Sequence, residues 1–296
     1  MAKTANAVIP DLKLGDGTPI PMLGYGLGTA WSKLSPGGLD RTIIEGIKTA
    51  IKLGYTHLDG AEMYNTEPEM GVAIKESKIE RSKVFITGKV STNISNIPEA
   101  IDESLKKLQV DYVDLYLIHD PFFAQNEGDL RRAWKAMEEV KESGKAKSIG
   151  VSNYLEKHLK ATLAVAKTKP SINQIEFHPY LQHENLLEYH RAQGIAVAAY
   201  APLTAATKAK PGPCDALLAS LAKKYCVSEG EICLRWCIDQ GFVAVTTSSK
   251  EERLSDYLRT MAFSLTPKEV GDLSNLGLEK HFRGFWGKKF NENDRS

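Results

Sequence analysis

The sequence predicts a one-domain α/β protein, a (β/α)8 TIM barrel that spans residues 1–296. Strand-like runs alternate with helical segments along the chain, and neither a low-complexity linker nor a break in composition divides it. In addition, three consecutive runs end on ionisable residues, Asp59, Lys89 and His119, at a constant spacing of 30 residues. This spacing is the length of one strand–helix unit, so corresponding strand ends carry the three groups in turn.

The expected elements follow one another in a regular order after an N-terminal hairpin. Residues 11–20 form this hairpin cap around Asp16-Gly17, a turn dipeptide between short apolar runs. Strands are expected at 22–27, 55–59, 84–89, 113–119, 146–151, 172–177, 195–200 and 242–246. Helices are expected at 39–53, 68–77, 97–109, 129–143, 155–167, 184–193, 215–225, 228–239 and 251–259. A tail of about residues 279–296 completes the chain as a C-terminal substrate loop.

An open doubly wound sheet is the alternative architecture, and the motifs argue against it. Gly24, Gly26 and Gly28 alternate, but Thr29 and Trp31 stand where a dinucleotide-binding fingerprint needs its third glycine. The chain also lacks a phosphate-binding loop and a G-x-S-x-G nucleophile motif. The closed barrel is therefore favoured, and it brings the carboxyl ends of its strands together on the face where such barrels carry their active sites.

Charge and hydropathy argue against several classes of partner. The formal net charge is +1 and the sequence pI is near 7.7, so nothing points to nucleic acid or to an acidic membrane surface. No apolar run is long enough to span a bilayer, and residues 1–6 lack the apolar core of a signal peptide. We therefore expect a cytoplasmic protein with a small-molecule substrate, and a monomer satisfies everything in the sequence.

Cysteine and histidine spacing does not favour a metal site or a disulfide. The cysteines are Cys214, Cys226, Cys233 and Cys237, and no two of them form a C-x-x-C pair. His178 and His183 have no carboxylate or thiol constellation beside them in the sequence, and we expect them to belong to loop structure. Buried cysteine is often simply a small apolar residue, so no metal is expected.

The side chains at the three strand ends, together with a nearby tyrosine, point to carbonyl chemistry. Tyr64 lies in the loop after Asp59, and a phenol with a pKa of about 10 is a poor acid at neutral pH. An ammonium such as Lys89 lowers that pKa, and a carboxylate beside it fixes its position and charge. The tyrosine can then donate a proton to a carbonyl oxygen that His119 orients. No side-chain nucleophile is evident, so a bound hydride donor is the natural complement.

The motifs around these residues resemble those of the aldo-keto reductase family over essentially the whole chain. The matching segments are 26–29, 58–64, 87–89, 117–121, 150–153, 173–180 and 199–203. The resemblance implies a (β/α)8 barrel that reduces carbonyl compounds with NADPH and without a metal. It also implies that Tyr64 is the general acid, that Lys89 and Asp59 tune it, and that His119 orients the carbonyl group.

The same resemblance implies where NADPH/NADP+ binds. Ser152, Asn153 and Gln174 would hold the nicotinamide carboxamide, and Tyr200 would stack on the ring. The remaining cofactor residues implied are Thr29, Leu203, Thr246, Thr247, Ser248, Ser249, Lys250 and Arg253.

At some positions the residue differs from the one that is usual in the family. They are Gly60, Asp120, Thr247 and Tyr257, where the family commonly has Thr, Trp, Lys and Asn. Thr247 weakens the case for NADPH over NADH, because the lysine it replaces lies near the adenosine 2′-phosphate. Arg253 keeps its position at the entrance of the final predicted helix, where backbone N–H groups also favour phosphate. We predict a preference for NADPH; the alternative is that Lys250 and Arg253 form a solvated helix face.

The sequences of segments 117–123 and 246–250 are similar to those of a fungal branch of the family, the reductases of conjugated polyketones, ketopantoyl lactone and α-keto amides. Aromatic residues in loops agree with a compact dicarbonyl substrate, because they could form a flat apolar wall. The predicted substrate residues are Trp31, Phe122, Phe123 and Trp286, with Phe285 beside them. The alternative for these rings is ordinary packing. Arg283, in the tail, could contact a second carbonyl group, and the alternative is that its side chain is solvated.

Other functions stay open at this stage. The chain could be an aldose or xylose reductase, or a regulatory subunit that binds NADPH with little turnover. Lys89 could form a Schiff base, as in barrel aldolases. Residues 204–213 contain two lysines, Lys208 and Lys210, and we expect this loop to act as a clasp over the bound cofactor.

Overall fold

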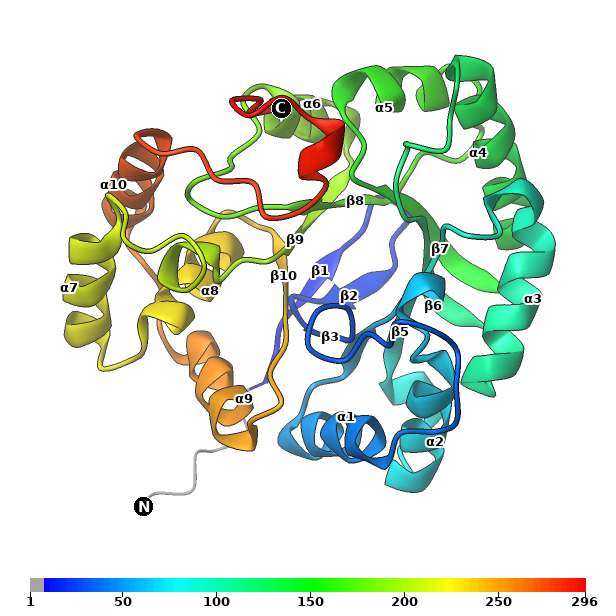
Figure 1. Ribbon diagram of the computed structural model, residues 1–296, viewed down its shortest axis with the longest axis horizontal. Helices are drawn as coiled ribbons and strands as arrows, with labels where there is room; N and C mark the ends of the chain where they lie inside the picture. The colour runs from blue at the N-terminus through cyan, green and yellow to red at the C-terminus, as the bar shows by residue number, and fades with distance from the viewer. Residues whose placement is uncertain (1–7) are drawn as a thin grey trace.

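The computed structural model describes residues 8–296 and contains a closed barrel of eight parallel strands, in the order β10-β3-β4-β5-β6-β7-β8-β9 (Figure 1). The strands are β3 (Leu23–Gly26), β4 (His57–Asp59), β5 (Phe85–Val90), β6 (Val113–Ile118), β7 (Ala146–Ser152), β8 (Ile172–Glu176), β9 (Ala196–Tyr200) and β10 (Val243–Thr246). Each of them falls on a run expected from the sequence, and the prediction of a (β/α)8 barrel is confirmed.

Helices surround the barrel, and those between consecutive strands return the chain to the amino end of the sheet (Figure 1). They are α1 (Arg41–Leu53), α2 (Glu67–Ser77), α3 (Ile97–Leu108), α4 (Glu127–Glu142), α5 (Glu156–Leu163), α6 (Leu186–Gln193), α7 (Asp215–Tyr225), α8 (Glu229–Asp239), α9 (Glu251–Leu258) and α10 (Pro267–Leu278). The first nine correspond to predicted helices. Helix α10 is not among the predicted helices, although Thr266 and Glu269 form a capping box and Pro267 occupies its first turn.

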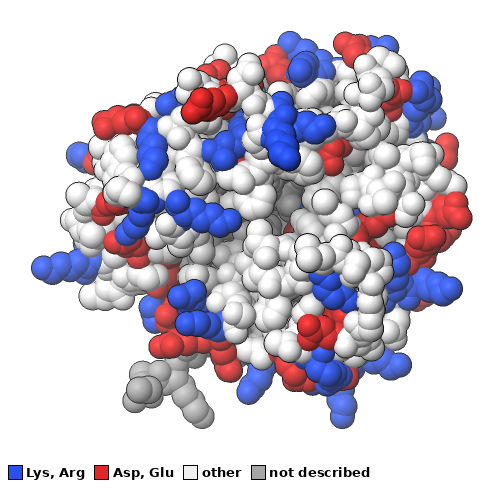
Figure 2. Space-filling view, in the orientation of Figure 1, with Lys and Arg blue, Asp and Glu red and all other residues white. Residues whose placement is uncertain are grey.

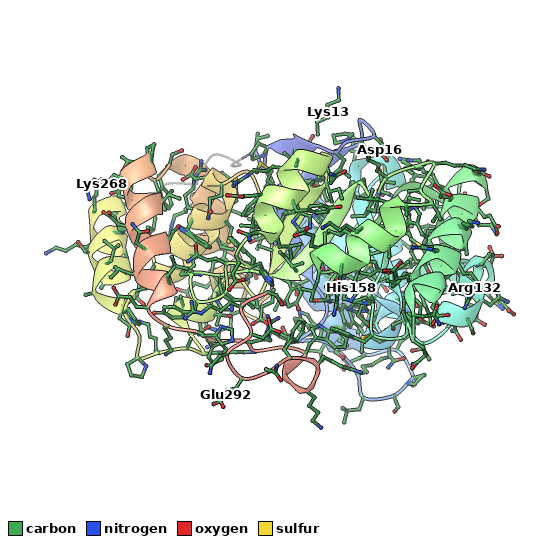
Figure 3. The ribbon with its side chains drawn as sticks, turned by 90° about the horizontal axis from the view of Figure 1, so that it is seen from above. Lys13, Asp16, Arg132, His158, Lys268 and Glu292 are labelled. Carbon is green, nitrogen blue, oxygen red and sulfur yellow. The ribbon has the colours of Figure 1, made fainter. Side chains whose placement is uncertain are left out.

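The barrel interior is closed at the amino ends of the strands. The hairpin predicted at 11–20 is present as β1 (Asp11–Lys13) and β2 (Pro19–Pro21), with Gly17 at φ 90° in the turn. Leu14 and Ile20 of this hairpin join one inward-facing apolar cluster with barrel residues Phe85, Leu115, Leu117, Ile172, Ala198, Val243 and Val245. Figure 3 shows Lys13 and Asp16 of the hairpin on one face and Glu292 of the C-terminal segment on the opposite face.

The strands obey the two-residue alternation expected of a sheet buried on both sides. Leu115 and Leu117 point into the barrel, whereas Tyr116 and Ile118 pack outward in the larger cluster under the helices. Apolar side chains therefore fill the amino half of the barrel, and polar side chains are left for the carboxyl ends of the strands.

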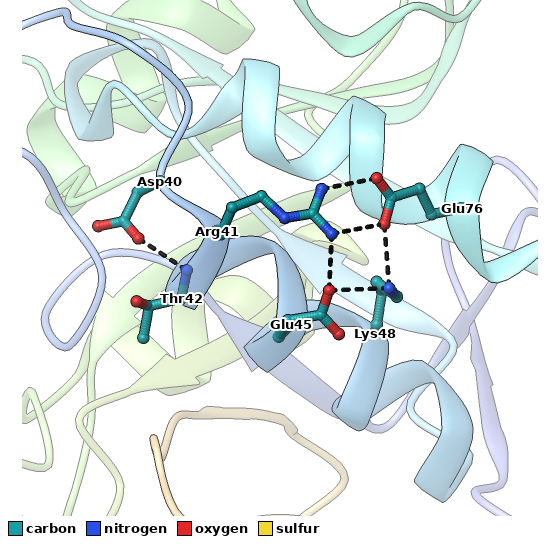
Figure 4. Close-up of polar contacts among 6 residues, drawn as sticks. All are labelled: Asp40, Arg41, Thr42, Glu45, Lys48 and Glu76. Atoms are coloured by element: carbon teal, nitrogen blue, oxygen red, sulfur yellow. Dashed lines mark hydrogen bonds and ion pairs between the residues drawn. The ribbon is translucent and has the colours of Figure 1, made fainter.

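An exposed ion-pair network joins α1 to α2 (Figure 4). Arg41 and Lys48 of α1 both reach Glu76 of α2, and both also pair with Glu45 within α1. Asp40 caps α1 by accepting from the Thr42 N–H at 2.7 Å. Because solvent screens exposed ion pairs, this network joins the two helices while contributing little to stability.

Within residues 8–296 the structure contains no helix of the length and hydropathy needed to cross a membrane. In the same range no cluster of three or more histidine, cysteine or acidic residues has the arrangement of a metal site, and the cysteines are free. Residues 1–6, on which the expected absence of a signal peptide rests, lie outside the described residues.

Candidate active site

A cavity of about 580 Å³ opens at the carboxyl ends of the strands. Figure 2 shows this face hollowed near its centre, with lysine and arginine side chains beside the opening. The residues lining the cavity include Thr29, Ser32, Asp59, Met63, Tyr64, His119, Ser152, Asn153, Gln174, Tyr200, Leu203, Thr207, Lys208, Thr246, Thr247, Arg253, Tyr257, Phe285 and Trp286. Most of the predicted site residues therefore come together in one place.

A buried ion pair lies at the floor of this cavity. Asp59 ends β4 level with Thr87 of β5, and Lys89 lies two residues further along β5 on the same face. The Lys89 Nζ is 2.5 Å from the Asp59 Oδ1 and 2.8 Å from the Gly60 carbonyl oxygen. Gln174 donates to the second oxygen of Asp59 at 2.7 Å. Burial acts to lower the pKa of Lys89, but the charges of Asp59 and Tyr64 and the hydrogen bonds to both together outweigh it, and the net pKa is raised.

Tyr64 and His119 converge above this pair. Tyr64 ends a short 3-10 helix, Glu62–Tyr64, and its hydroxyl lies 3.3 Å from the His119 Nε2. The Lys89 Nζ lies 5.1 Å from the centre of the Tyr64 ring. Burial, reinforced by the positive charge of Lys89, holds the pKa of His119 well below its usual value, so the imidazole is neutral at neutral pH.

The pKa of Tyr64 differs from the sequence expectation in its net direction. Burial raises the pKa of the hydroxyl, and the opposing effect of the Lys89 ammonium is smaller. The Asp59 carboxylate, which lies beside the same ammonium, adds to the rise because it also disfavours the phenolate. Tyr64 is thus held protonated, as a proton donor has to be before it reacts.

Glu62, which is not among the site residues predicted from the sequence, fixes the loop that carries Tyr64. Its buried carboxylate accepts from the backbone N–H groups of Ser91, Thr92 and Asn93, at 2.9, 3.0 and 3.3 Å. These residues follow β5, the strand of Lys89, so the carboxylate ties the Tyr64 turn to the neighbouring strand end. Acidic residues in loops are usually solvated. The three backbone N–H groups come close to the Glu62 carboxylate only in the folded chain, so the sequence alone does not single it out.

A polar chain links the next three strands. Ser152 donates to the Gln174 carbonyl at 2.8 Å, and the Asn153 amide donates to the His119 carbonyl at 2.9 Å. The Tyr200 hydroxyl donates to the Asn153 Oδ1 at 2.7 Å. The four predicted nicotinamide residues are therefore mutually oriented along one wall of the cavity.

The far end of the cavity lies over the entrance of α9. Thr246, Thr247 and Arg253 line it, together with Tyr257, and the buried Thr247 hydroxyl has no partner among the described residues. Ser248, Ser249 and Lys250 do not line the cavity. The Ser248 carbonyl instead accepts from the Tyr25 hydroxyl, and Ser249 and Lys250 are exposed.

The aromatic residues expected to contact the substrate fall into two groups. Trp286 lines the cavity with Phe285, and its ring lies 6.4 Å from that of His119. Phe122 does not line the cavity but packs behind Trp286 at 5.1 Å. Phe123 packs against the outer core, and Trp31 is buried against Gly46 of α1. Only Trp286 among the four predicted substrate residues therefore faces the cavity.

Other departures have simple structural accounts. Asp120, where the family commonly has Trp, is half-buried and accepts from the Phe122 N–H at 2.8 Å, so it stabilises a turn. Lys208 lines the cavity, whereas Lys210 pairs with Glu229 of α8. The Lys280 side chain bonds the carbonyl groups of Ala209 and Pro211, which anchors the second half of the predicted clasp.

Comparisons with known proteins agree with this geometry. The model of the Aldo/keto reductase family matches residues 24–277. The chain is 42% identical to the NAD/NADP-dependent indole-3-acetaldehyde reductase of Schizosaccharomyces pombe, over 91% of this chain and 96% of the relative. It is 40% identical to the NADPH-dependent alpha-keto amide reductase of Saccharomyces cerevisiae, over 94% of each chain.

Solved structures give the same result. An aldo-keto reductase of Bombyx mori in complex with NADP superposes with a TM-score of 0.81 at 32% identity, covering 91% of this chain and 93% of that one. An aldo/keto reductase from Brucella melitensis superposes with the same TM-score at 34% identity, over 91% and 100%. The resemblance to the family and to its α-keto amide branch, drawn from the sequence motifs, is confirmed.

Proposed function

The chain belongs to the aldo/keto reductase family and is an NADPH-dependent carbonyl reductase, and on this premise we propose that Tyr64 is its proton donor and compact dicarbonyls its substrates. One observation supports the assignment of Tyr64 most directly. Its hydroxyl points at the His119 Nε2 from 3.3 Å, above a fully buried Lys89–Asp59 pair. A carbonyl oxygen that approaches these two groups meets two hydrogen-bond partners at once.

The residues present fit NADPH. The carboxamide side chains of Asn153 and Gln174 and the ring of Tyr200 lie at one part of the cavity, and the Arg253 guanidinium lies at the other. The Thr247 hydroxyl is buried and has no partner among residues 8–296, so it offers a further donor in the same cavity as Arg253. We assign the nicotinamide to the first group and the 2′-phosphate to the second. When bound, the cofactor supplies the hydride that this chain has no side chain to deliver.

The chain's own groups manage the proton. Neutral His119 orients the carbonyl oxygen without adding a positive charge, and protonated Tyr64 donates its hydroxyl proton to that oxygen. The phenolate left behind lies beside the Lys89 ammonium, which Asp59 keeps charged and in place. Gln174 holds the other oxygen of Asp59, so the pair keeps its position during turnover.

The cavity wall supports a flat, compact substrate. Trp286 presents an apolar ring beside the His119 imidazole, Phe285 lies edge-on to Tyr200, and Met63 lines the same cavity. A polyol sugar would need several hydrogen-bond partners, and this wall offers apolar surface instead. We therefore propose ketopantoyl lactone, isatin-like compounds and α-keto esters or amides as substrates, in agreement with the α-keto amide reductase among the relatives. A flat aromatic aldehyde is the second candidate, because another relative is an indole-3-acetaldehyde reductase.

The test is NADPH consumption over a panel of carbonyl compounds, with NADH as the control. The kcat/KM values for ketopantoyl lactone and isatin are compared with those for xylose, glyceraldehyde and indole-3-acetaldehyde. Higher kcat/KM on the dicarbonyls supports the proposal, and higher kcat/KM on the sugars or on the aromatic aldehyde overturns the substrate assignment. Turnover on none of them, with NADPH still bound, would favour a regulatory NADPH-binding subunit.

The Tyr64→Phe variant tests the proton donor. Because the ring is retained and only the hydroxyl is lost, we expect kcat to fall by about 10²–10⁴-fold while the NADPH dissociation constant changes little. Unchanged kcat would remove Tyr64 from the mechanism. Borohydride trapping with a carbonyl substrate distinguishes the Schiff-base alternative, which predicts a covalent adduct on Lys89.

We also propose that the protein is a single-domain monomer in the cytoplasm. Light scattering should give a mass near 32.7 kDa, and twice that value would show a dimer. Thermal unfolding should show one transition, and imaging of a fluorescent fusion checks the location.

A further inference from the structure

We propose that Glu176 is a positioning residue whose buried carboxylate fixes the C-terminal segment 284–286, so that Phe285 and Trp286 close the substrate end of the cavity. The proposal rests on the proposed function, because it assigns these two rings to the substrate wall. Glu176 is the last residue of β8 and is only 2% exposed. A buried carboxylate is costly unless its oxygens are hydrogen-bonded, so its partners indicate what it holds in place.

Both oxygens of Glu176 are used, and the partners are consecutive backbone groups of the C-terminal segment. The Gly284 N–H donates to Oε1 at 2.7 Å, and the Phe285 N–H donates to Oε2 at 3.0 Å. The His178 Nε2 lies 3.2 Å from Oε1 and completes the set. A single side chain therefore bridges two parts of the chain that are 108 and 109 residues apart.

The location of Glu176 along β8 relates the anchor to the catalytic groups. Gln174 lies two residues earlier and so shares its face of the strand, and Gln174 donates to the Asp59 carboxylate. One strand thus fixes both the catalytic ion pair and the substrate wall. Strand β8 therefore restrains the movement of Phe285 and Trp286 relative to Tyr64.

The anchored segment needs a restraint, because it holds an unfavourable conformation. Trp286 has φ 58° and ψ 18°, the left-handed region that bulky residues rarely occupy. Such a residue persists only where its surroundings over-determine it. The two hydrogen bonds to Glu176 fix the backbone immediately before Trp286. The ring is then held between Phe122, at 5.1 Å, and His119, at 6.4 Å.

Phe285 links the same anchor to the cofactor side of the cavity. Its ring lies edge-on to Tyr200 at 5.3 Å, and the Lys208 Nζ lies 5.0 Å from its centre. Loosening the segment should therefore affect the substrate more than the cofactor, because the Tyr200 hydroxyl keeps its own bond to Asn153.

The central variant is Glu176→Gln, and Glu138→Gln is its matched control. The amide presents a donor where one backbone N–H needs an acceptor, so one bond is lost and a donor faces a donor. Glu138 is also a buried carboxylate that accepts from two consecutive N–H groups, those of Lys167 and Thr168, both at 2.7 Å. It lies on α4 and does not line the cavity. Both N–H groups bond the same oxygen of Glu138, so Glu138→Gln can keep them through its amide oxygen. It therefore controls for the loss of a buried carboxylate charge without the loss of a backbone anchor.

We expect Glu176→Gln to raise the KM for the carbonyl substrate about 5- to 20-fold, with kcat and the NADPH dissociation constant within about twofold. Acrylamide quenching of tryptophan fluorescence should increase, because the other tryptophans, Trp31, Trp134 and Trp236, are buried. That increase should vanish in a Trp286→Phe background. Glu138→Gln should change neither KM nor quenching.

A second variant changes the other side of this contact, in the segment 284–286. Gly284 is exposed, and a Cβ added there would lie 3.1 Å from the Glu176 Oε1. Gly284→Ala should therefore push the carboxylate and the Gly284 N–H apart by a few tenths of an ångström, and raise KM by less than Glu176→Gln does. It decides the matter if Glu176→Gln does not fold.

The outcomes separate this proposal from the proposed function. Unchanged KM and quenching in a folded Glu176→Gln would overturn it. So would an equal rise of KM in Glu138→Gln, or increased quenching without a change of KM. If the wild-type protein reduces no carbonyl in the panel, the proposed function fails by itself, and the quenching comparison still shows whether Glu176 holds the segment.

Discussion

At the scale of single residues, Lys89 is the group that depends most on its partner. Its ammonium is completely buried, and the Asp59 carboxylate at 2.5 Å keeps it charged. In Asp59→Asn, the largest influence that opposes burial is lost, so the pKa of Lys89 should fall below its ordinary value. We expect the free energy of unfolding to drop by about 3–5 kcal/mol and kcat/KM for carbonyl reduction to fall by about 100-fold. Urea unfolding and steady-state kinetics measure the two effects.

Asp114→Asn provides the control for that variant. Asp114 is also buried and pairs with Arg81 at 2.7 Å, but on the opposite side of the barrel, where the hairpin lies. It should lose stability and keep its kcat/KM per folded molecule. An Asp59→Asn protein with wild-type kcat/KM would show that Lys89 does not need its charge for the reaction.

The preference for NADPH should depend on Arg253. Arg253 lines the cavity, as Thr247 does, whereas Lys250 is exposed and lies outside it. Arg253→Ala should raise the KM for NADPH about tenfold or more and leave the KM for NADH within about twofold. Lys250→Ala should change the NADPH value less than about threefold. Equal effects of Arg253→Ala on both cofactors would place the 2′-phosphate elsewhere.

The residues of the site differ in how far the sequence predicts them. Asp59, Lys89 and His119 are predictable, because the 30-residue spacing places them at successive strand ends. The burial of Trp31 is not, because the direction of a loop side chain depends on which helix packs over it, here at Gly46. Glu176 could not be assigned either, since its donors come from a segment more than 100 residues later.

At the scale of secondary structure, the alternation of strands and helices was read correctly because each strand is buried on both faces. Such strands form short continuous apolar runs bounded by polar residues, and these are easy to recognise. The helix α10 was missed even though Thr266, Pro267 and Glu269 carry an ordinary start signal. It follows the last predicted barrel helix, so the repeating pattern gave no reason to expect another.

The capping box of α10 makes a testable contribution to stability. Thr266 accepts from the Glu269 N–H, and the Glu269 carboxylate accepts from the Thr266 N–H and from the Tyr225 hydroxyl of α7. Thr266→Ala should therefore cost about 1 kcal/mol and lower Tm by about 2 °C. Thr266→Ser keeps the acceptor and should match the wild type in calorimetry. A wild-type Tm in Thr266→Ala would show that packing against α7 holds the helix without its cap.

At the scale of the whole molecule, the two ends of the barrel have different compositions. Apolar side chains and the hairpin fill the amino end, while the ionisable groups of the cavity are buried at the carboxyl end. Several histidines are buried, among them His57, His183 and His190. Burial lowers the pKa of each of these three. The molecule therefore folds around neutral imidazoles, which makes its stability depend on pH.

The sign of this dependence follows from His183 and His190, whose pKa burial lowers to about 4 from an ordinary 6.5. Between these two values the unfolded chain binds more protons than the folded one, so stability is lost as pH falls through the window. At pH 5 each histidine should cost about 2 kcal/mol relative to pH 7. His190→Gln removes one titrating group, so its loss of stability between pH 7 and 5, measured by urea unfolding, should be smaller by about that amount. His281→Gln, at a partly exposed position, should change the pH dependence less. The same pH dependence in His190→Gln and the wild type would mean that His190 is already protonated in the folded protein.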